Sequence, residues 1–209
     1  MENANFVKHN SLLILFFFVT IVFSCSSVKS YKSHFLMDPR DYLTFTAGDE
    51  PVAVTLNPGF VGSNGDNAEI QYTFSNSTID TSDYKWATFE PGNTVIIPAK
   101  TSVKLRGKSI STSGMSKSLF TFSNTVSASG YVDSLRLEGP DYKQFLGLDE
   151  NCYYNMFNGC DHLLTPPELG CEDMTIFANG KYFTTKACYL QMFKDCKDLK
   201  AAPDLPAKI

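Results

Sequence analysis

The chain has 209 residues, a formal net charge of −4 and 13% aromatic residues. This length suits one or two folded domains, and the aromatic content is sufficient to build a core. The mildly acidic balance, without a cluster of basic residues, argues against nucleic acid as a partner, because phosphate binding needs concentrated positive charge.

Residues 1–25 are predicted to be a targeting segment. Lys8 and His9 precede an apolar run from Leu12 to Phe23, which is short for a membrane span and suits an export signal. A small residue directly before Cys25 resembles a bacterial lipoprotein signal, in which the chain is cut before Cys25 and a lipid is attached there. The alternatives are an ordinary signal peptide, which would remove Cys25, and an uncleaved anchor, which the short run disfavours.

Residues 26–40 are rich in Ser and Lys and are predicted to be a tether. From residue 41 to residue 137 the apolar pattern has a period of two, as in Leu43, Phe45 and Ala47. Turn signals such as Pro91-Gly92-Asn93 separate about eight short runs of this kind, which indicates an antiparallel β-sandwich. Trp86 is expected to anchor its core, the alternative being an exposed aromatic residue that binds a ligand.

Residues 138–209 contain one pattern twice, at an offset of 36 residues, as from Cys152 to Cys188. The matched positions are apolar or Pro and the positions between them are polar, as in stacked repeats whose inward residues contact neighbouring units. We expect the shared interior to contain the following residues: Cys152, Met156, Phe157, Cys160, Leu163, Cys188, Met192, Phe193, Cys196 and Leu199.

The four-residue steps from Cys152 to Met156 and Cys160 predict a helix of two turns. Gly159 is expected to end this helix, and residues 163–165 to form a short strand that stops at Pro166-Pro167. Residues 171–186 separate the copies and are predicted to form an inserted hairpin, because Asn179-Gly180 is a turn signal between apolar pairs. The fold class expected for the whole chain is therefore mainly β with short helices.

The pattern Phe-x-x-Cys-x-x-Leu, found as Phe157 to Leu163 and as Phe193 to Leu199, resembles the leucine-rich surface repeat of BspA-like proteins of bacteria and protists. The resemblance covers residues 151–169 and 187–205, and it implies a cell-surface solenoid with a β-rich segment ahead of it. This chain departs from the family pattern at Gly170, where the second copy has Pro206, and in the length of the insertion. Two copies are few for a solenoid, so we expect the array to be truncated or to continue elsewhere.

The cysteines and histidines do not have the spacing of a reactive site. Cys152 and Cys160 are too far apart in sequence for a zinc site, so buried free thiols are expected. The alternative is a Cys152–Cys188 or Cys160–Cys196 disulfide, with Cys171 unpaired in either case. His162 follows Asp161 on a turn that is predicted to be solvated. We therefore expect no catalytic residue, no metal and no cofactor.

These features together predict an exported protein of the cell surface or outer membrane, lipid-anchored or secreted, that binds or adheres and has no catalytic site. The expected partner is a protein or glycan on a host or neighbouring cell, and the membrane is reached through the N-terminal lipid. One alternative is a secreted carbohydrate-binding module or enzyme accessory domain that uses Trp86, Tyr84 and Tyr72. Another is an envelope protein whose repeats stack with a second copy. The predicted binding face consists of outward residues of the repeats: Asn155, Asn158, Lys194, Asp195, Lys197 and Asp198.

Overall fold

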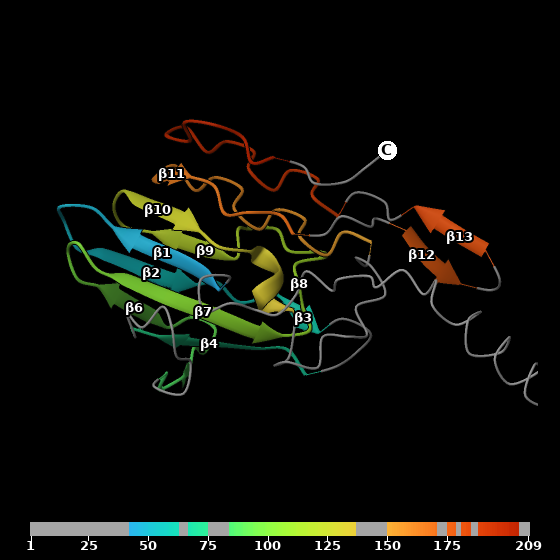
Figure 1. Cartoon of the computed structure of the whole chain (residues 1–209), viewed down its shortest axis with the longest axis horizontal. Coiled ribbons are helices and arrows are strands. Elements are labelled where there is room, and N and C mark those ends of the chain that lie inside the picture. The colour runs from blue at the N-terminus through green and yellow to red at the C-terminus, as the bar shows by residue number, and fades with distance from the viewer. Residues whose placement is uncertain are drawn as a thin grey trace, which may run out of the picture. The chain divides into compact units, whose positions relative to one another are not determined.

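The computed structural model describes residues 42–62, 67–74, 84–136, 150–170, 175–178, 181–184 and 188–204. The chain separates into two units, Met1–His34 and Phe35–Ile209, and all described residues belong to the second. The predictions for the targeting segment, Cys25 and the tether therefore concern residues outside this description. The described part is mainly β, as expected, and the helix found within it is the short 3-10 helix η2 (Val132–Leu135) (Figure 1).

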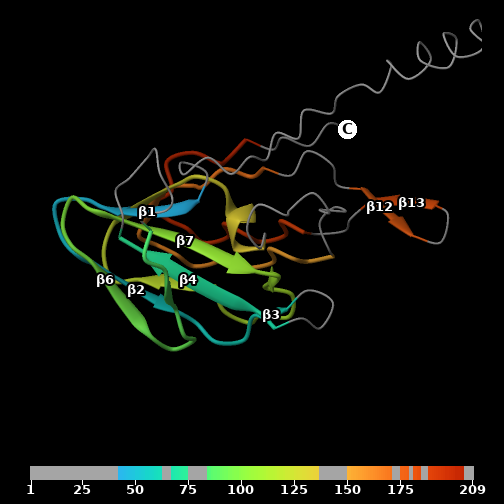
Figure 2. The ribbon, with the colours of Figure 1, turned by 60° about the horizontal axis from the view of Figure 1, so that its bottom comes forward.

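The strands form several sheets (Figure 1, Figure 2). The six-stranded sheet has neighbouring strands antiparallel except for the parallel pair β10–β11, and its order is β11 (Leu163–Thr165), β10 (Val126–Ser129), β1 (Leu43–Ala47), β7 (Ser102–Lys108), β4 (Glu69–Thr73) and β5 (Ala87–Thr88). An antiparallel sheet of three strands has the order β6 (Thr94–Ile97), β2 (Val52–Leu56) and β9 (Phe120–Phe122). Two-stranded antiparallel sheets join β3 (Val61–Gly62) to β8 (Ile110–Ser111) and β12 (Thr175–Ala178) to β13 (Lys181–Thr184). The last pair lies where the sequence predicts the inserted hairpin.

The six-stranded and three-stranded sheets share one core, and all three strands of the smaller sheet bury alternate side chains. In β2, Val52, Val54 and Leu56 are buried and the residues between them are half-buried. The Phe45 ring of β1 meets the rings of Phe120 and Phe122 of β9 edge to face, with centroids 5.0 Å apart in both cases. The period-two pattern in the sequence therefore marks side chains that face the other sheet.

The helix predicted around Cys152, Met156 and Cys160 is wrong, because residues 151–159 form consecutive turns. The backbone φ is positive at every fourth residue, 57° at Asn151, 59° at Asn155 and 73° at Gly159, whereas an α-helix needs negative φ throughout. Asn and Gly tolerate this left-handed conformation best, which explains why a four-residue spacing can build turns instead of a helix. Gln191 and Asp195 repeat the conformation in the second copy, with φ of 57° and 59°.

The two copies, called here the first segment (residues 151–169) and the second segment (residues 187–205), lie against each other in register. The amides of Tyr153 and Phe157 donate to the carbonyls of Cys188 and Met192, each over 2.9 Å. The first segment rests in turn on residues 112–119, because Thr112 donates to the Cys152 carbonyl at 2.8 Å. Figure 1 shows the second segment (red) as the outer layer over the first (orange).

Gly107, in β7, lies close to the backbone of Leu135 in η2. A methyl group at this position would collide with the backbone carbonyl of Leu135 and would lie 2.9 Å from that of Glu69. Backbone atoms cannot rotate away as a flexible side chain can, so Gly107→Ala is expected to lower the free energy of unfolding by about 2–3 kcal/mol. Chemical denaturation measures this loss. Gly48→Ala is the matched control, since nothing lies within 4 Å of its added methyl group, and an equal loss in both variants would contradict the prediction.

Candidate binding surface of the paired segments

The interior of the paired segments is built from stacked rings and sulfur-containing side chains. The Phe157 ring is stacked between Phe120, at 5.9 Å, and Phe193, at 5.4 Å, and Tyr153 is stacked on Tyr189 at 5.6 Å. Of the predicted interior residues, the buried ones are Cys152, Met156, Phe157, Cys160, Leu163, Cys188 and Met192, and the half-buried ones that pack on them are Phe193, Cys196 and Leu199. A stack of this kind fixes the outward residues of both segments relative to each other.

Asn155 does not belong to the predicted binding face, because its side chain points inward and is only 5% exposed. Its amide nitrogen donates to the carbonyl of Met115 over 3.0 Å, and its oxygen accepts from Asn158 over 2.9 Å. The prediction assumed a helix, on which Asn155 would face solvent, whereas the positive-φ turn directs it to residues 112–119. Asn158 is half-buried beside it.

The outward edge of the stack carries charges of both signs. Four residues of the predicted binding face lie there and are exposed: Lys194, Asp195, Lys197 and Asp198. The Lys197 ammonium lies 2.8 Å from Asp161, and the His162 imidazole lies 3.9 Å from Asp198. Both pairs join equivalent positions of the two segments. The hydrogen bond between Lys197 and Asp161 lowers the pKa of the carboxyl and raises the pKa of the amine. Exposed ion pairs of this kind contribute little to stability, so these charges are available to a partner.

The cysteines of the stack are free thiols: Cys152, Cys160, Cys188 and Cys196. The Cys160 thiol donates to the carbonyl of Phe120 at 3.1 Å, and the Cys196 thiol donates to the carbonyl of Phe157 at 2.9 Å. Burial raises the pKa of Cys160 to about 12 and also raises the pKa values of Cys152 and Cys196, whereas a hydrogen bond with Cys152 lowers the pKa of Cys188. A protonated thiol is a weak nucleophile, so Cys152, Cys160 and Cys196 act as packing groups. Cys160 and Cys196 are also hydrogen-bond donors. Cys171 lies outside the described residues.

We expect Cys152 and Cys160, which are buried and have raised pKa values, to resist alkylation in the folded protein. At neutral pH, iodoacetamide should modify each of them at least roughly tenfold more slowly in buffer than in denaturant, because the reaction needs an accessible thiolate. Peptide mass spectrometry at timed intervals measures the rates, with the unfolded chain as the control. Rapid modification of Cys160 in the folded chain would show that its thiolate forms readily and would reopen a catalytic role.

A small cavity of about 200 Å³ lies beside Cys160 and His162, between residues 118–122 and residues 159–162. A Cys–His nucleophile needs the imidazole within hydrogen-bond reach of the sulfur. Among the described residues, no hydrogen bond joins these two side chains, since the thiol donates to Phe120 and the imidazole faces Asp198. The cavity therefore lacks the geometry of a nucleophilic site.

A buried polar cluster joins the six-stranded sheet to the first segment, and the sequence reasoning did not identify it. Asp133, in η2, accepts hydrogen bonds from the Tyr153 hydroxyl at 2.6 Å and from the Gly170 amide at 2.9 Å. The Arg136 guanidinium lies 5.7 Å from the centre of the Tyr153 ring. Burial raises the pKa of Asp133 above its ordinary 3.8, although the hydrogen bonds and Arg136 oppose this shift. The cluster fixes the orientation of the first segment and contains no solvent-exposed reactive group.

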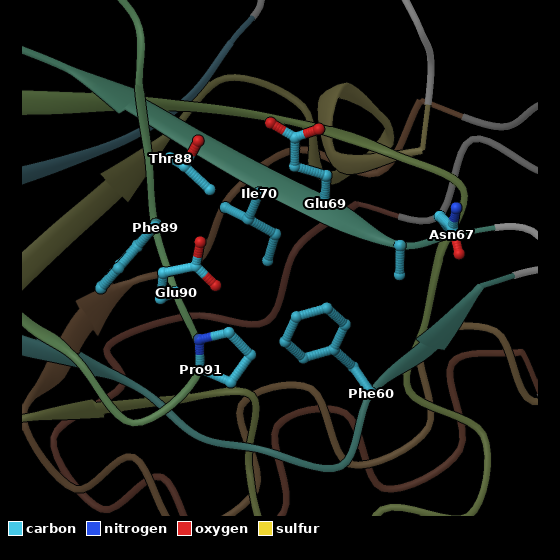
Figure 3. A pocket seen from close by; sticks show the side chains of 9 residues that line it. Phe60, Asn67, Glu69, Ile70, Thr88, Phe89, Glu90 and Pro91 are labelled. Carbon is cyan, nitrogen blue, oxygen red and sulfur yellow. The ribbon is translucent and has the colours of Figure 1, made fainter.

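A second cavity, of about 380 Å³, lies between β4 and the residues that follow β5 (Figure 3). Figure 3 shows Phe60 and Pro91 on one side and Ile70 on another, with the carboxylate of Glu90 directed into the space. Two carboxylates in one cavity can act as an acid–base pair, but Glu69 accepts a hydrogen bond from Gln71 at 2.6 Å and both glutamates are exposed. The geometry of this cavity therefore indicates a solvated hollow.

The aromatic residues of the carbohydrate-binding alternative contact one another or the core. Trp86 is half-buried and meets Tyr42 at 5.1 Å and Tyr84 at 5.7 Å, while the Arg106 guanidinium covers its ring at 4.3 Å. Tyr72 packs on the core residue Phe89 at 5.6 Å. Trp86 thus belongs to a separate aromatic cluster, neither deep in the core nor open to a sugar on the face that Arg106 occupies.

Within the described ranges, no group of three His, Cys, Asp or Glu side chains is placed to hold a metal ion. In the same part of the chain, no helix has the length and apolar character that a membrane span requires. No family model, curated protein or solved structure matches the chain.

Proposed function

We propose that this chain is an exported surface protein that binds a macromolecular partner through the charged edge of its paired segments. In this proposal the two larger sheets form a β-sandwich that supports a short repeat solenoid, and the N-terminal segment directs export. The partner is a protein or glycan on a host or neighbouring cell. The observation that carries the proposal is the in-register stacking of the two segments, which lines up equivalent outward residues on one surface.

The character of this edge supports binding over catalysis. Lys194, Asp195, Lys197 and Asp198 are exposed, whereas Cys152, Cys160 and Cys188 are buried and Cys160 has a raised pKa. A rigid support keeps the entropy loss on binding small, because the edge is already ordered by the stacked rings beneath it. Charges of both signs at fixed spacing favour a partner of complementary pattern over one that is simply acidic or basic.

The test neutralises the edge without changing the net charge. The edge variant carries Lys194→Gln, Asp195→Asn, Lys197→Gln and Asp198→Asn. The control variant removes two acids and two lysines from exposed positions elsewhere, with Asp49→Asn, Glu50→Gln, Lys100→Gln and Lys117→Gln. Each full chain is displayed on beads and mixed with extracellular-matrix extract or intact microbial cells, and the retained material is measured.

We expect the unaltered chain and the control variant to retain the partner, and the edge variant to retain at least roughly tenfold less. Equal retention by the edge and control variants would reject the edge as the binding site. Retention by the unaltered chain that does not exceed that of bare beads would reject the binding function.

A further inference from the structure

Along residues 153–159 the main-chain hydrogen bonds to the second segment run in one direction, whereas further along the amides of Asp198 and Lys200 donate back to the carbonyls of Asp161 and Leu164. The first segment donates to the second through every second amide: Tyr153 to Cys188, Asn155 to Leu190, Phe157 to Met192 and Gly159 to Lys194, over 2.8–3.3 Å. On its other side the first segment accepts, at the carbonyls of Cys152 and Met156, from the amides of Thr112 and Leu119. Over residues 152–159 the first segment therefore donates toward the second segment and accepts on the opposite side.

The outer end of the second segment presents donors. The residues equivalent to Asn155, Phe157 and Gly159 are Gln191, Phe193 and Asp195, and none of their amides has a hydrogen-bond partner among the described residues. The carbonyls of Gln191 and Phe193 are used within the layer, by the amides of Lys194 and Cys196. In Figure 1 this layer is the outermost of the stack. Within the part of the chain that the structure describes, the end thus offers a row of N–H groups without partners at two-residue spacing.

The same end has apolar surface beside that row. Phe157 stacks on one face of the half-buried Phe193 ring at 5.4 Å, with the planes only 4° apart. Leu190 is 51% exposed. This combination of N–H donors and an aromatic face is what the first segment, through Phe157 and its amides, offers to the second.

We propose that this end binds a polypeptide segment as a further layer, with main-chain carbonyls two residues apart and an aromatic side chain over Phe193. A segment of the chain's own repeat pattern has both features, because it reproduces the contact that the second segment makes with the first. Along residues 191–195 two such ends of separate molecules do not pair, since N–H groups would face N–H groups. The accepting side of the first segment is already occupied by Thr112 and Leu119. This inference rests on the proposed function in one respect, namely that the chain binds a macromolecule. It concerns a different surface, the outer end of the second segment, and gives the chemistry of the partner that binds there.

Amide hydrogen exchange tests this proposal. One variant duplicates residues 170–205 directly after Leu205, which preserves the 36-residue offset between equivalent positions. A control variant has the same duplication with Met192→Asp and Phe193→Asp in the added copy alone. NMR follows the amides of Gln191, Phe193 and Asp195, with those of Asn155, Phe157 and Gly159 as internal references for the folded stack. A synthetic peptide of residues 187–205, added to the unaltered chain, provides the same measurement without altering the protein.

We expect the three outer amides to exchange rapidly in the unaltered chain and in the control, and at least roughly tenfold more slowly in the duplicated chain. Outer amides that stay unprotected with both the duplication and the peptide would overturn the proposal, as would protection already present in the unaltered chain. The exchange measurements involve no binding to cells or matrix. A failure of layer addition is therefore distinguishable from a failure of the charged edge to bind its partner.

Discussion

Phe157→Ala is expected to lower the free energy of unfolding by about 3–5 kcal/mol. The Phe157 side chain is fully buried and meets three other rings: Phe120 and Phe193 by stacking and Phe45 edge to face at 6.3 Å. Removing it leaves a cavity between the sheets and both segments, and the rigid stack cannot close such a space. Urea or guanidinium denaturation, followed by tryptophan fluorescence and circular dichroism, measures the loss.

Phe193→Ala is the matched control, because it removes the same group from the outer end of the same column of rings. Phe193 is half-buried and one ring, that of Phe157, stacks on it. The expected loss is therefore smaller, about 1–2 kcal/mol. Equal losses in the two variants would show that the column does not continue into the shared core.

Asp133→Ala is expected to lower the free energy of unfolding by about 3 kcal/mol when measured near pH 4. The substitution leaves the Tyr153 hydroxyl and the Gly170 amide without an acceptor in a buried place, and it removes the acid beside Arg136. Tyr153→Phe removes one of these hydrogen bonds and keeps the ring stacked on Tyr189, so we expect it to cost about 1 kcal/mol. A larger loss for Tyr153→Phe than for Asp133→Ala would contradict the central position of the carboxyl group.

The pH dependence of the same site follows from the raised pKa of Asp133. A carboxyl group that binds its proton more tightly in the folded state stabilises the fold fully below its unfolded pKa of 3.8, and this stabilisation is lost as the pH rises through the folded pKa. The stability of the natural chain relative to Asp133→Asn should therefore decline as the pH rises from about 4. Denaturation of both chains at stepped pH values measures the difference. A difference that grows with pH would mean that the buried carboxylate is ionised and stabilised by Tyr153, Gly170 and Arg136.

The β-rich character was predictable from sequence because burial on a strand alternates between neighbouring residues. The alternation in Leu43, Phe45 and Ala47 is visible without knowing which strands pair. The interior of the paired segments was also predictable, since the same apolar residue types recur at a constant offset and contact each other across the stack.

The local conformation of the segments was not predictable from apolar spacing alone. A step of four residues fits one face of a helix as well as a series of four-residue turns, and the difference lies in Asn151, Asn155 and Gly159. These residue types at the same spacing are a signal for left-handed φ, and reading it would also have placed Asn155 correctly. The Asp133–Tyr153 contact had no such signal, because it depends on how η2 meets the first segment.

The hydrogen bonds that join the layers have a consequence for how the chain folds. Thr112 and Leu119 donate to the first segment, and residues 153–159 of the first segment donate to the second, so the second segment finds these main-chain partners once the first is in place. We therefore expect the second segment to form after the sheets and the first segment.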